Sequence, residues 1–277
     1  MAGIPPIFHH EDLPMTTRTF RLRRAPAVSA LSLALLMALS MPAWAADPVC
    51  VDAPGNPLPA EPTNQGIEDG EGATGENATC DPTASAYGFR NNASANQSTA
   101  FGRENTASGN QSTAFGRGNT ASGIGSNAFG GGNISTSIQS SAFGAANEAT
   151  GTQSSAFGFL NRASKFESSA FGSSNLSSGD SSSAFGTENE ATGESSSAFG
   201  SGNLAADTRS SAFGANNHAF AVDSSAFGAF NTANGLRSSA IGHSNQASGS
   251  RSSAIGSDNR ADVLNSSGFG LGNRSSG

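Results

Sequence analysis

The chain has 277 residues, a formal charge of −7 and 13% charged residues, and it contains 35 glycines and 18 phenylalanines. An ordinary globular domain spreads its apolar residues over Leu, Ile, Val and Met, so this composition argues against a standard layered α/β or helical core. Beyond the N-terminal leader no apolar run approaches about 18 residues, which excludes a membrane-spanning helix there.

Residues 1–45 have the features of an export leader, with Met15 as the expected start. Four arginines from Arg18 to Arg24 form a basic region, and the apolar stretch 27–39 follows it. The small-x-small sequence at 43–45 then provides a cleavage signal, so we expect Sec-dependent export and cutting after Ala45. A short membrane anchor is the alternative, which the length of the apolar run and Pro42 disfavour.

The segment 46–83 is acidic and rich in Pro and Gly, with eight acidic residues and no Lys or Arg. It holds the only two cysteines, Cys50 and Cys80. In an exported chain a Cys50–Cys80 disulfide is expected, and free or intermolecularly paired thiols are the alternative. Two cysteines without a nearby histidine do not suit zinc. From residue 46 onward there are 10 basic and 19 acidic residues, which argues against nucleic acid binding.

Residues 84–277 consist of fourteen repeats of 14 residues, without insertion or deletion, with the unit S-S-A-F-G-x-x-N-x-A-S-G-x-x. One position of the repeat is aromatic or isoleucine, and Gly follows it in every repeat. The residues at this aromatic position are Tyr87, Phe101, Phe115, Phe129, Phe143, Phe157, Phe171, Phe185, Phe199, Phe213, Phe227, Ile241, Ile255 and Phe269. A second position is always asparagine: Asn91, Asn105, Asn119, Asn133, Asn147, Asn161, Asn175, Asn189, Asn203, Asn217, Asn231, Asn245, Asn259 and Asn273.

A fixed period this short predicts stacked coils, because a helical hairpin repeat needs more than about thirty residues. We expect two short strands per coil, S-A-F-G and N-x-A-S, joined by turns. Alternation predicts that Ala and Gly of the first strand point one way and Ser and Phe the other. The position between Asn and Ala varies freely and is expected to face solvent, and the Gly after the second strand is expected to allow the turn.

Stacking brings equivalent residues to about 4.8 Å from one another, which predicts a rod of roughly 65 Å. The asparagines are then expected to form a structural hydrogen-bond ladder, as stacked amides do in cross-β structures. The aromatic positions are expected to form a packing row. Two regular apolar rows on opposite faces of one strand cannot both lie inside a thin coil. The row that lies outside forms an apolar stripe on the surface of the coil, and burial of that stripe predicts a symmetric homo-oligomer.

The repeat resembles the head repeats of YadA-like trimeric autotransporter adhesins and related bacterial haemagglutinins. Residues 238–242 and 252–256, both Ser-Ser-Ala-Ile-Gly, come closest to the S-x-A-I-G of that family. The resemblance implies an all-β, left-handed parallel β-roll assembled as a homotrimer, displayed on Gram-negative surfaces for adhesion. Phe replaces Ile in most repeats of this chain, and its Asn is more uniform. No coiled-coil stalk or membrane-anchor domain follows, so we expect a released head, a fragment, or a protein held by a partner.

The leading expectation is an exported surface protein that adheres to host matrix proteins or cell-surface ligands. Variable basic residues are the candidate contacts: Arg90, Arg103, Arg117, Arg162 and Lys165. Two alternatives are a purely structural surface protein and a protein that binds an ordered lattice, ice or polysaccharide, through Ser/Thr rows such as Ser98-Thr99, Ser112-Thr113 and Ser154-Ser155. His218 and His243 occupy different repeat positions, and the acidic residues are scattered. We therefore expect no enzyme, metal or cofactor.

Overall fold

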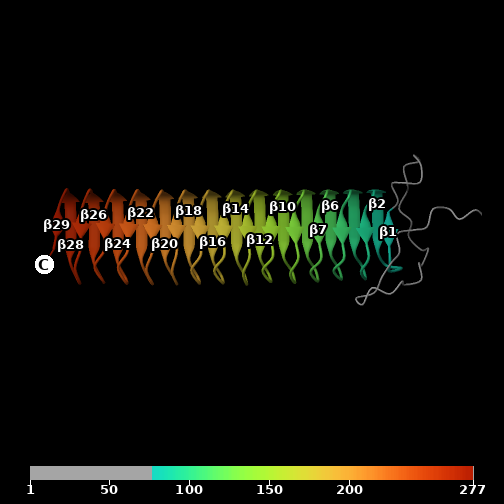
Figure 1. The fold of residues 1–277 in the computed structure, drawn as a ribbon, viewed down its shortest axis with the longest axis horizontal. Helices are drawn as coiled ribbons and strands as arrows, with labels where there is room; N and C mark the ends of the chain where they lie inside the picture. The colour runs from blue at the N-terminus through green and yellow to red at the C-terminus, as the bar shows by residue number, and fades with distance from the viewer. Residues whose placement is uncertain (1–76, 277) are drawn as a thin grey trace, which may run out of the picture. The chain divides into compact units, whose positions relative to one another are not determined.

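The computed structural model describes residues 77–276, all of which belong to one stack of coils (Figure 1). Each coil contributes one five-residue strand and one two-residue strand, and every strand pairs in parallel with its equivalent 14 residues away. Phe171, for example, lies opposite Phe185. The predicted all-β parallel solenoid of 14-residue coils is confirmed. The leader, its cleavage site and Cys50 lie outside the described residues.

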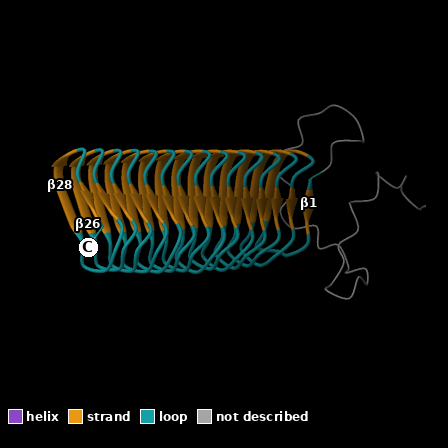
Figure 2. Cartoon of the chain, turned by 60° about the vertical axis from the view of Figure 1, so that its left-hand side comes forward, coloured by secondary structure: helices purple, strands orange, loops and turns teal. Residues whose placement is uncertain are grey.

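The two sheets run the full length of the described stack, one on each side of a narrow interior (Figure 2). The long-strand sheet consists of β2 (Ser85–Phe89), β4 (Thr99–Arg103), β6 (Thr113–Arg117), β8 (Asn127–Gly131), β10 (Ser141–Ala145), β12 (Ser155–Phe159), β14 (Ser169–Ser173), β16 (Ser183–Thr187), β18 (Ser197–Ser201), β20 (Ser211–Ala215), β22 (Ser225–Ala229), β24 (Ser239–His243), β26 (Ser253–Ser257) and β28 (Ser267–Leu271). The short-strand sheet consists of β1 (Ala78–Thr79), β3 (Asn92–Ala93), β5 (Thr106–Ala107), β7 (Thr120–Ala121), β9 (Ile134–Ser135), β11 (Glu148–Ala149), β13 (Arg162–Ala163), β15 (Leu176–Ser177), β17 (Glu190–Ala191), β19 (Leu204–Ala205), β21 (His218–Ala219), β23 (Thr232–Ala233), β25 (Gln246–Ala247), β27 (Arg260–Ala261) and β29 (Arg274–Ser275).

Two turns complete each coil. The first turn, residues 104–105 in the β4 coil, leads from the long strand to the short strand. The second turn, residues 108–112, leads from the short strand to the long strand of the next coil. No helix in residues 77–276 has the length and apolarity needed to cross a membrane.

The interior is filled by small side chains only. In the β14 coil these are Ala170 of the long strand, Asn175, Ser177 of the short strand and Ser182 of the second turn, all of them buried. Most coils have alanine where Ser177 lies, and the equivalents of these four positions are buried almost throughout the stack. A coil with an interior one side chain deep gains little from apolar area, so hydrogen bonds between coils carry much of its stability.

The aromatic row points outward. Phe171 flanks Ala170 along β14, and alternation sends the two side chains to opposite faces of the sheet. The alanine is fully buried, whereas Phe115 is 46% exposed. The sequence left open which of the two rows lies inside, and the size of the interior decides it because a phenyl ring does not fit between two sheets lined by alanine and serine.

The glycine that follows each aromatic residue is not an interior residue, so the expected grouping of Ala with Gly was wrong. Gly172 has a φ of +120°, and a Cβ built on it would lie 2.0 Å from the carbonyl oxygen of Gly186 in the next coil. A Cβ at Gly172 would therefore collide with the next coil of the stack. This contact recurs from Gly88 to Gly256 and explains why the position is glycine in thirteen of the fourteen repeats.

Left-handed backbone occurs at the turns without needing glycine. One such position lies in each first turn and another in each second turn, and twenty-two non-glycine residues adopt it with φ between 52° and 59°. Ala146 and Leu160 occupy the first-turn position in neighbouring coils, and Gln153 and Glu167 the second-turn position. The glycine expected to form the turn is not among the residues with positive φ, as Gly179 shows. A Cβ added to Gly179 would lie 1.9 Å from the Gly193 oxygen in the next coil, although Lys165 and Asp207 hold the equivalent position in other coils.

Candidate functional site

The asparagines lie in one buried ladder along the inside of the first turn. The Asn175 amide nitrogen donates to the Asn161 Oδ1 at 2.9 Å, to the Phe171 carbonyl at 3.0 Å and to the Gly186 carbonyl at 2.8 Å. The Asn175 backbone N–H donates to the same Asn161 oxygen at 3.1 Å. Each side chain thus joins three consecutive coils, and its polar atoms are paired although they are buried.

The aromatic row is a stack of parallel rings on the outer face of the long-strand sheet. From Phe129 to Phe213 the ring centroids are 4.7–4.8 Å apart and the planes differ by 1–5°. Each ring covers the face of its neighbour, so the stack presents ring edges to its surroundings. It is therefore an apolar ridge suited to pack against other apolar side chains.

Half of the hydroxyl rows proposed for lattice binding are inside the protein. Ser98, Ser112 and Ser154 are fully buried, while Thr99 and Ser155 point outward beside the aromatic row. The buried serines close the second turn, as the N–H of Gly109 donates to the Ser112 hydroxyl at 3.2 Å. That part of the lattice hypothesis is wrong, because these serines are buried in the second turns and do not reach the surface, even where a hydroxyl such as that of Ser154 has no hydrogen-bond partner.

Two coils replace a buried alanine by serine and pair the new hydroxyl. The Ser177 hydroxyl lies 2.6 Å from the Ser182 hydroxyl, and the Ser135 hydroxyl lies 2.7 Å from that of Ser140. Ser182 also accepts from the Gly179 N–H at 3.1 Å and donates to the Gly179 carbonyl at 2.7 Å. The Ser182 hydroxyl thus has hydrogen-bond partners on Gly179 besides Ser177, whereas the hydroxyls of Ser126, Ser154, Ser196 and Ser252, in coils with alanine at the second position, have none.

We expect Ser177→Ala to change the free energy of unfolding by no more than about 1 kcal/mol, since Ser182 keeps its bonds to Gly179. Ser182→Ala is expected to cost about 1–3 kcal/mol because it leaves a buried turn amide without its hydroxyl partner. Thermal denaturation of the two variants beside the parent measures both. A larger loss in Ser177→Ala than in Ser182→Ala would contradict this ranking.

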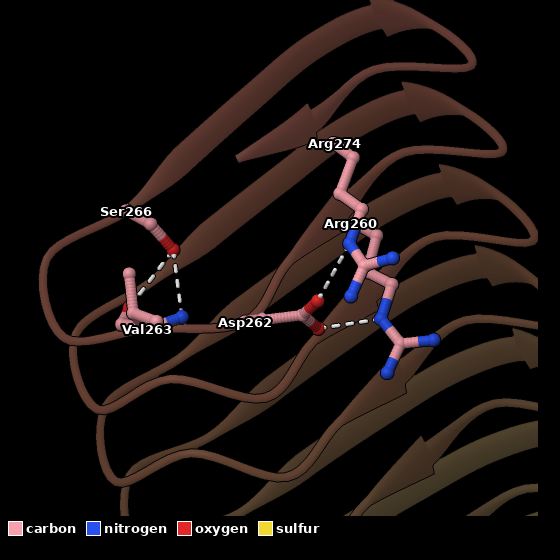
Figure 3. Close-up of polar contacts among 5 residues, drawn as sticks. All are labelled: Arg260, Asp262, Val263, Ser266 and Arg274. Atoms are coloured by element: carbon pink, nitrogen blue, oxygen red, sulfur yellow. Dashed lines mark hydrogen bonds and ion pairs between the residues drawn. The ribbon is translucent and has the colours of Figure 1, made fainter. Parts of the chain in front are cut away.

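Charged side chains pair along the stack, between coils. Glu148 and Arg162 hold equivalent positions of β11 and β13, with Nε and Oε2 3.3 Å apart. Asp223 lies between two arginines of the second turns, at 2.6 Å from Arg209 and 3.6 Å from Arg237. In Figure 3 Asp262 pairs with Arg260 of its own coil and with Arg274 of the next coil, both on the short-strand sheet. The figure also shows Ser266 closing the second turn on Val263.

These pairs keep the aspartates ionised. The hydrogen bond from Arg209 lowers the pKa of the Asp223 carboxyl below its ordinary value, and the Arg209 charge and Arg237 act in the same direction. The hydrogen bond from Arg260 likewise lowers the pKa of Asp262, helped by its charge and by Arg274. All these side chains lie at the surface, so the ion pairs add little to stability on their own.

The five basic residues named as candidate contacts do not form one cluster. Arg103 and Arg117 are exposed neighbours at the end of β4 and β6, and the guanidinium carbons of Arg90 and Arg103 lie 5.0 and 5.4 Å from the Phe89 ring centre. Arg162 lies on the short-strand sheet, and Lys165 lies in a second turn. The structure thus groups the first three and separates the last two.

His218 and His243 each pack against an aromatic ring. The His218 ring meets Phe220 edge-on at 5.3 Å, and His243 meets Phe230 at 5.8 Å. Residues 77–276 contain no group of three His, Cys, Asp or Glu side chains close enough to hold a metal ion. Cys80 is not a free thiol, and its predicted pairing with Cys50 stays a prediction because Cys50 lies outside the described residues.

A family model described as the YadA head domain repeat matches most of the repeat region. The matched segments are 83–105, 107–133, 135–160, 163–189, 177–203, 191–217, 208–231, 221–243 and 233–259. Together they cover more than half of the chain, and they coincide with the stacked coils. A comparison with curated proteins found no match.

Proposed function

Because the chain belongs to the YadA head-repeat family, we propose that it is an adhesin-like surface protein that works as a homotrimer and binds host matrix proteins or cell-surface ligands. The observation that carries the proposal is the outward aromatic row. It is apolar, continuous over many coils and partly to fully exposed on one chain. A regular apolar stripe of this kind marks an interface, and a symmetric assembly buries it on every chain at once.

The ring geometry favours packing against another protein chain over binding to a polysaccharide lattice. A sugar ring stacks on the face of an aromatic side chain, and here those faces are covered by the neighbouring rings at 4.7–4.8 Å. Ring edges suit a three-fold contact in which the rows of the three chains meet. The trimer leaves the short-strand sheet and its variable residues outward for a ligand, Arg162 among them.

The proposal also places the protein at the cell surface. The leader sequence supports Sec export, and membership of a surface-adhesin family supports display on a Gram-negative bacterium. The proposed mature chain begins after Ala45, and its acidic segment with the predicted disulfide precedes the stack. Binding belongs to the outer surface of the coils, whose interior is closed.

The assembly is tested by replacing two neighbouring rings of the row, Phe171→Ser with Phe185→Ser. We expect a trimer for the parent protein in light scattering and a monomer for the double variant, with an unchanged β-sheet spectrum because neither ring lies in the interior. Phe230→Ser is the control, since Phe230 is 57% exposed but lies in a first turn, off the row.

A monomeric parent protein would contradict the trimer. Adhesion is then tested separately with the assembled parent protein on immobilised extracellular matrix proteins and on host cells. Retention that Arg162→Glu reduces would support the ligand surface on the short-strand sheet. If neither the matrix proteins nor the host cells retain the protein, the proposed adhesive role is wrong, whereas the proposed trimer is unaffected.

A further inference from the structure

One stretch of the first turns has an arginine at one end, a phenylalanine at the other and almost no side chains between them. We define this first-turn shelf as the last residue of the long strand and the first residue of the turn in four successive coils: residues 117–118, 131–132, 145–146 and 159–160. Their sequences are Arg-Gly, Gly-Gly, Ala-Ala and Phe-Leu. A Cβ added to Gly118, Gly131 or Gly132 would have nothing within 4 Å, so the middle of the shelf is open. Three coil steps separate its ends, which makes the shelf about 14 Å long.

The arginine end of the shelf is positively charged, and little of that charge is neutralised. Arg103 and Arg117 hold equivalent positions of β4 and β6, so their side chains leave adjacent strands in register. Residues 82–147 contain three arginines, no lysine and one acidic residue, Glu104, which pairs with Arg103 at 3.4 Å. Arg117 forms no ion pair with any residue in 77–276. Its guanidinium can therefore donate two parallel hydrogen bonds to a carboxylate or sulfate.

An aromatic ring orders two of the guanidinium groups at this end. The guanidinium carbons of Arg90 and Arg103 lie 5.0 and 5.4 Å from the centre of the Phe89 ring. Cation–π contacts of this length restrict where the two side chains point. The positive end is thus partly ordered before a ligand arrives, which lowers the entropy that binding has to remove.

The opposite end of the shelf has an aromatic ring whose faces are open. Phe159 is 52% exposed, and its register neighbours Ala145 and Ser173 are too small to cover a ring. The aromatic row differs, because each of its rings is covered by the next at 4.7–4.8 Å. The C–H groups of a sugar ring pack well on the negative face of such an open ring. Phe159 therefore offers the stacking surface that the aromatic row lacks.

We propose that the first-turn shelf binds an anionic polysaccharide that runs along the stack, with a carboxylate or sulfate on Arg117 and a sugar ring on Phe159. The inference rests on the proposed adhesive function and names a ligand class for it. The open middle of the shelf admits the bulky, hydroxylated rings of such a chain. Three arginines are too few for a nucleic acid, whose backbone carries a charge at every residue. The shelf shares no residue with the aromatic row, so the proposed trimer contact is separate from it.

Binding of acidic polysaccharides by the assembled parent protein is the first test. Heparin and hyaluronan distinguish sulfate from carboxylate as the group held by Arg117, and dextran is the uncharged control. We expect an acidic chain to bind at about 0.01 M salt and to be released at about 1 M, where the Debye length is only about 3 Å. Dextran that binds equally well, or no binding of either acidic chain, would overturn the proposal. Retention on matrix proteins or host cells without polysaccharide binding would overturn this inference alone and leave the proposed adhesive function standing.

Charge variants test the arginine end. Arg117→Gln is expected to weaken binding about tenfold, because it removes hydrogen bonds between charged groups. Glu104→Gln is expected to strengthen binding, since it releases Arg103 from its ion pair. A gain of this kind cannot come from misfolding. Arg251→Gln is the control, because it removes an exposed arginine from a second turn of another coil. Equal losses in the two arginine variants would mean that binding follows net charge, and would overturn the site.

Replacement of the ring tests the apolar end. Phe159→Ser is expected to weaken binding several-fold and to leave its salt dependence unchanged, because the ring carries no charge. The strand accepts this serine, since Ser173 holds the equivalent position of β14. Phe230→Ser is the control, because Phe230 is similarly exposed but lies in a first turn five coils away. Equal binding by the two phenylalanine variants would overturn the role of Phe159.

A charge placed on the middle of the shelf tests its path. Gly132→Glu is expected to abolish binding, because the new carboxylate lies where the anionic chain has to pass. The backbone accepts this residue, since Glu104 and Glu188 hold equivalent positions with φ of 57° and 55°. Unchanged binding by Gly132→Glu would overturn the shelf. A single-stranded DNA that binds as tightly as the polysaccharide, and is weakened by the same variants, would overturn the choice of ligand class.

Discussion

Gly172→Ala is expected to disrupt the stack at the β14 coil. The substitution has two costs. The φ of +120° is one that residues with a Cβ rarely adopt, and the new Cβ would lie 2.0 Å from the Gly186 carbonyl oxygen. That oxygen cannot move away freely, because it accepts the 2.8 Å hydrogen bond from Asn175. We expect a loss of roughly 3 kcal/mol or more, from backbone strain of about 1–3 kcal/mol together with the steric overlap.

The matched control is Gly132→Ala. Gly132 also has a positive φ, +64°, but nothing lies within 4 Å of a Cβ built on it. The equivalent position of the next coil already holds Ala146 at a φ of 54°. We expect a change within about 1 kcal/mol, since substitution at a compatible position acts mainly through the unfolded chain. Chemical denaturation of both variants measures the difference in their free energies of unfolding. Similar losses of stability would show that the positive φ, and not the contact with the next coil, causes the destabilisation.

The register of the stack could be predicted from the sequence because no repeat gains or loses a residue. With Asn161 and Asn175 always 14 residues apart, a parallel coil is the arrangement that brings every equivalent residue together. The side on which the aromatic row lies could not be predicted in this way. Alternation along β14 places Ala170 and Phe171 on opposite faces, but it does not say which face is inside.

The turns show why other features escaped prediction. A residue with left-handed backbone is usually glycine or asparagine. The residue type at the positions of Leu160 and Glu167 nevertheless varies from coil to coil. Hydrogen bonds between adjacent coils hold them there, such as Leu160 N–H to the Ala145 carbonyl at 3.0 Å and Glu167 N–H to the Thr152 carbonyl at 2.9 Å. Because these bonds come from the stack, no local pattern records them. The buried Ser182 was missed for a similar reason, since a turn serine and a surface serine look alike in sequence.

Asn217→Leu is expected to break the asparagine ladder at the β20 coil. The Asn217 side chain bonds Asn203, Phe213 and Gly228 at 2.8–3.0 Å, and its oxygen accepts two bonds from Asn231. Leucine removes all of them and leaves buried carbonyl and N–H groups unpaired. At about 1–3 kcal/mol for each unsatisfied group, we expect a loss of at least about 4 kcal/mol.

The neighbouring residue supplies the control for this experiment. Asn216→Leu introduces the same side chain one residue earlier, at an exposed first-turn position where the β12 coil already carries Leu160 at a φ of 55°. We expect it to melt within a few degrees of the parent protein. Stability in a solenoid is close to a sum over coils and their interfaces, so the damage from Asn217→Leu should be local. Hydrogen exchange should show loss of protection in the coils on either side of Asn217 and not at Asn105. Uniform loss along the stack would mean that the coils unfold as one unit, and equal melting of the two variants would mean that the ladder contributes nothing.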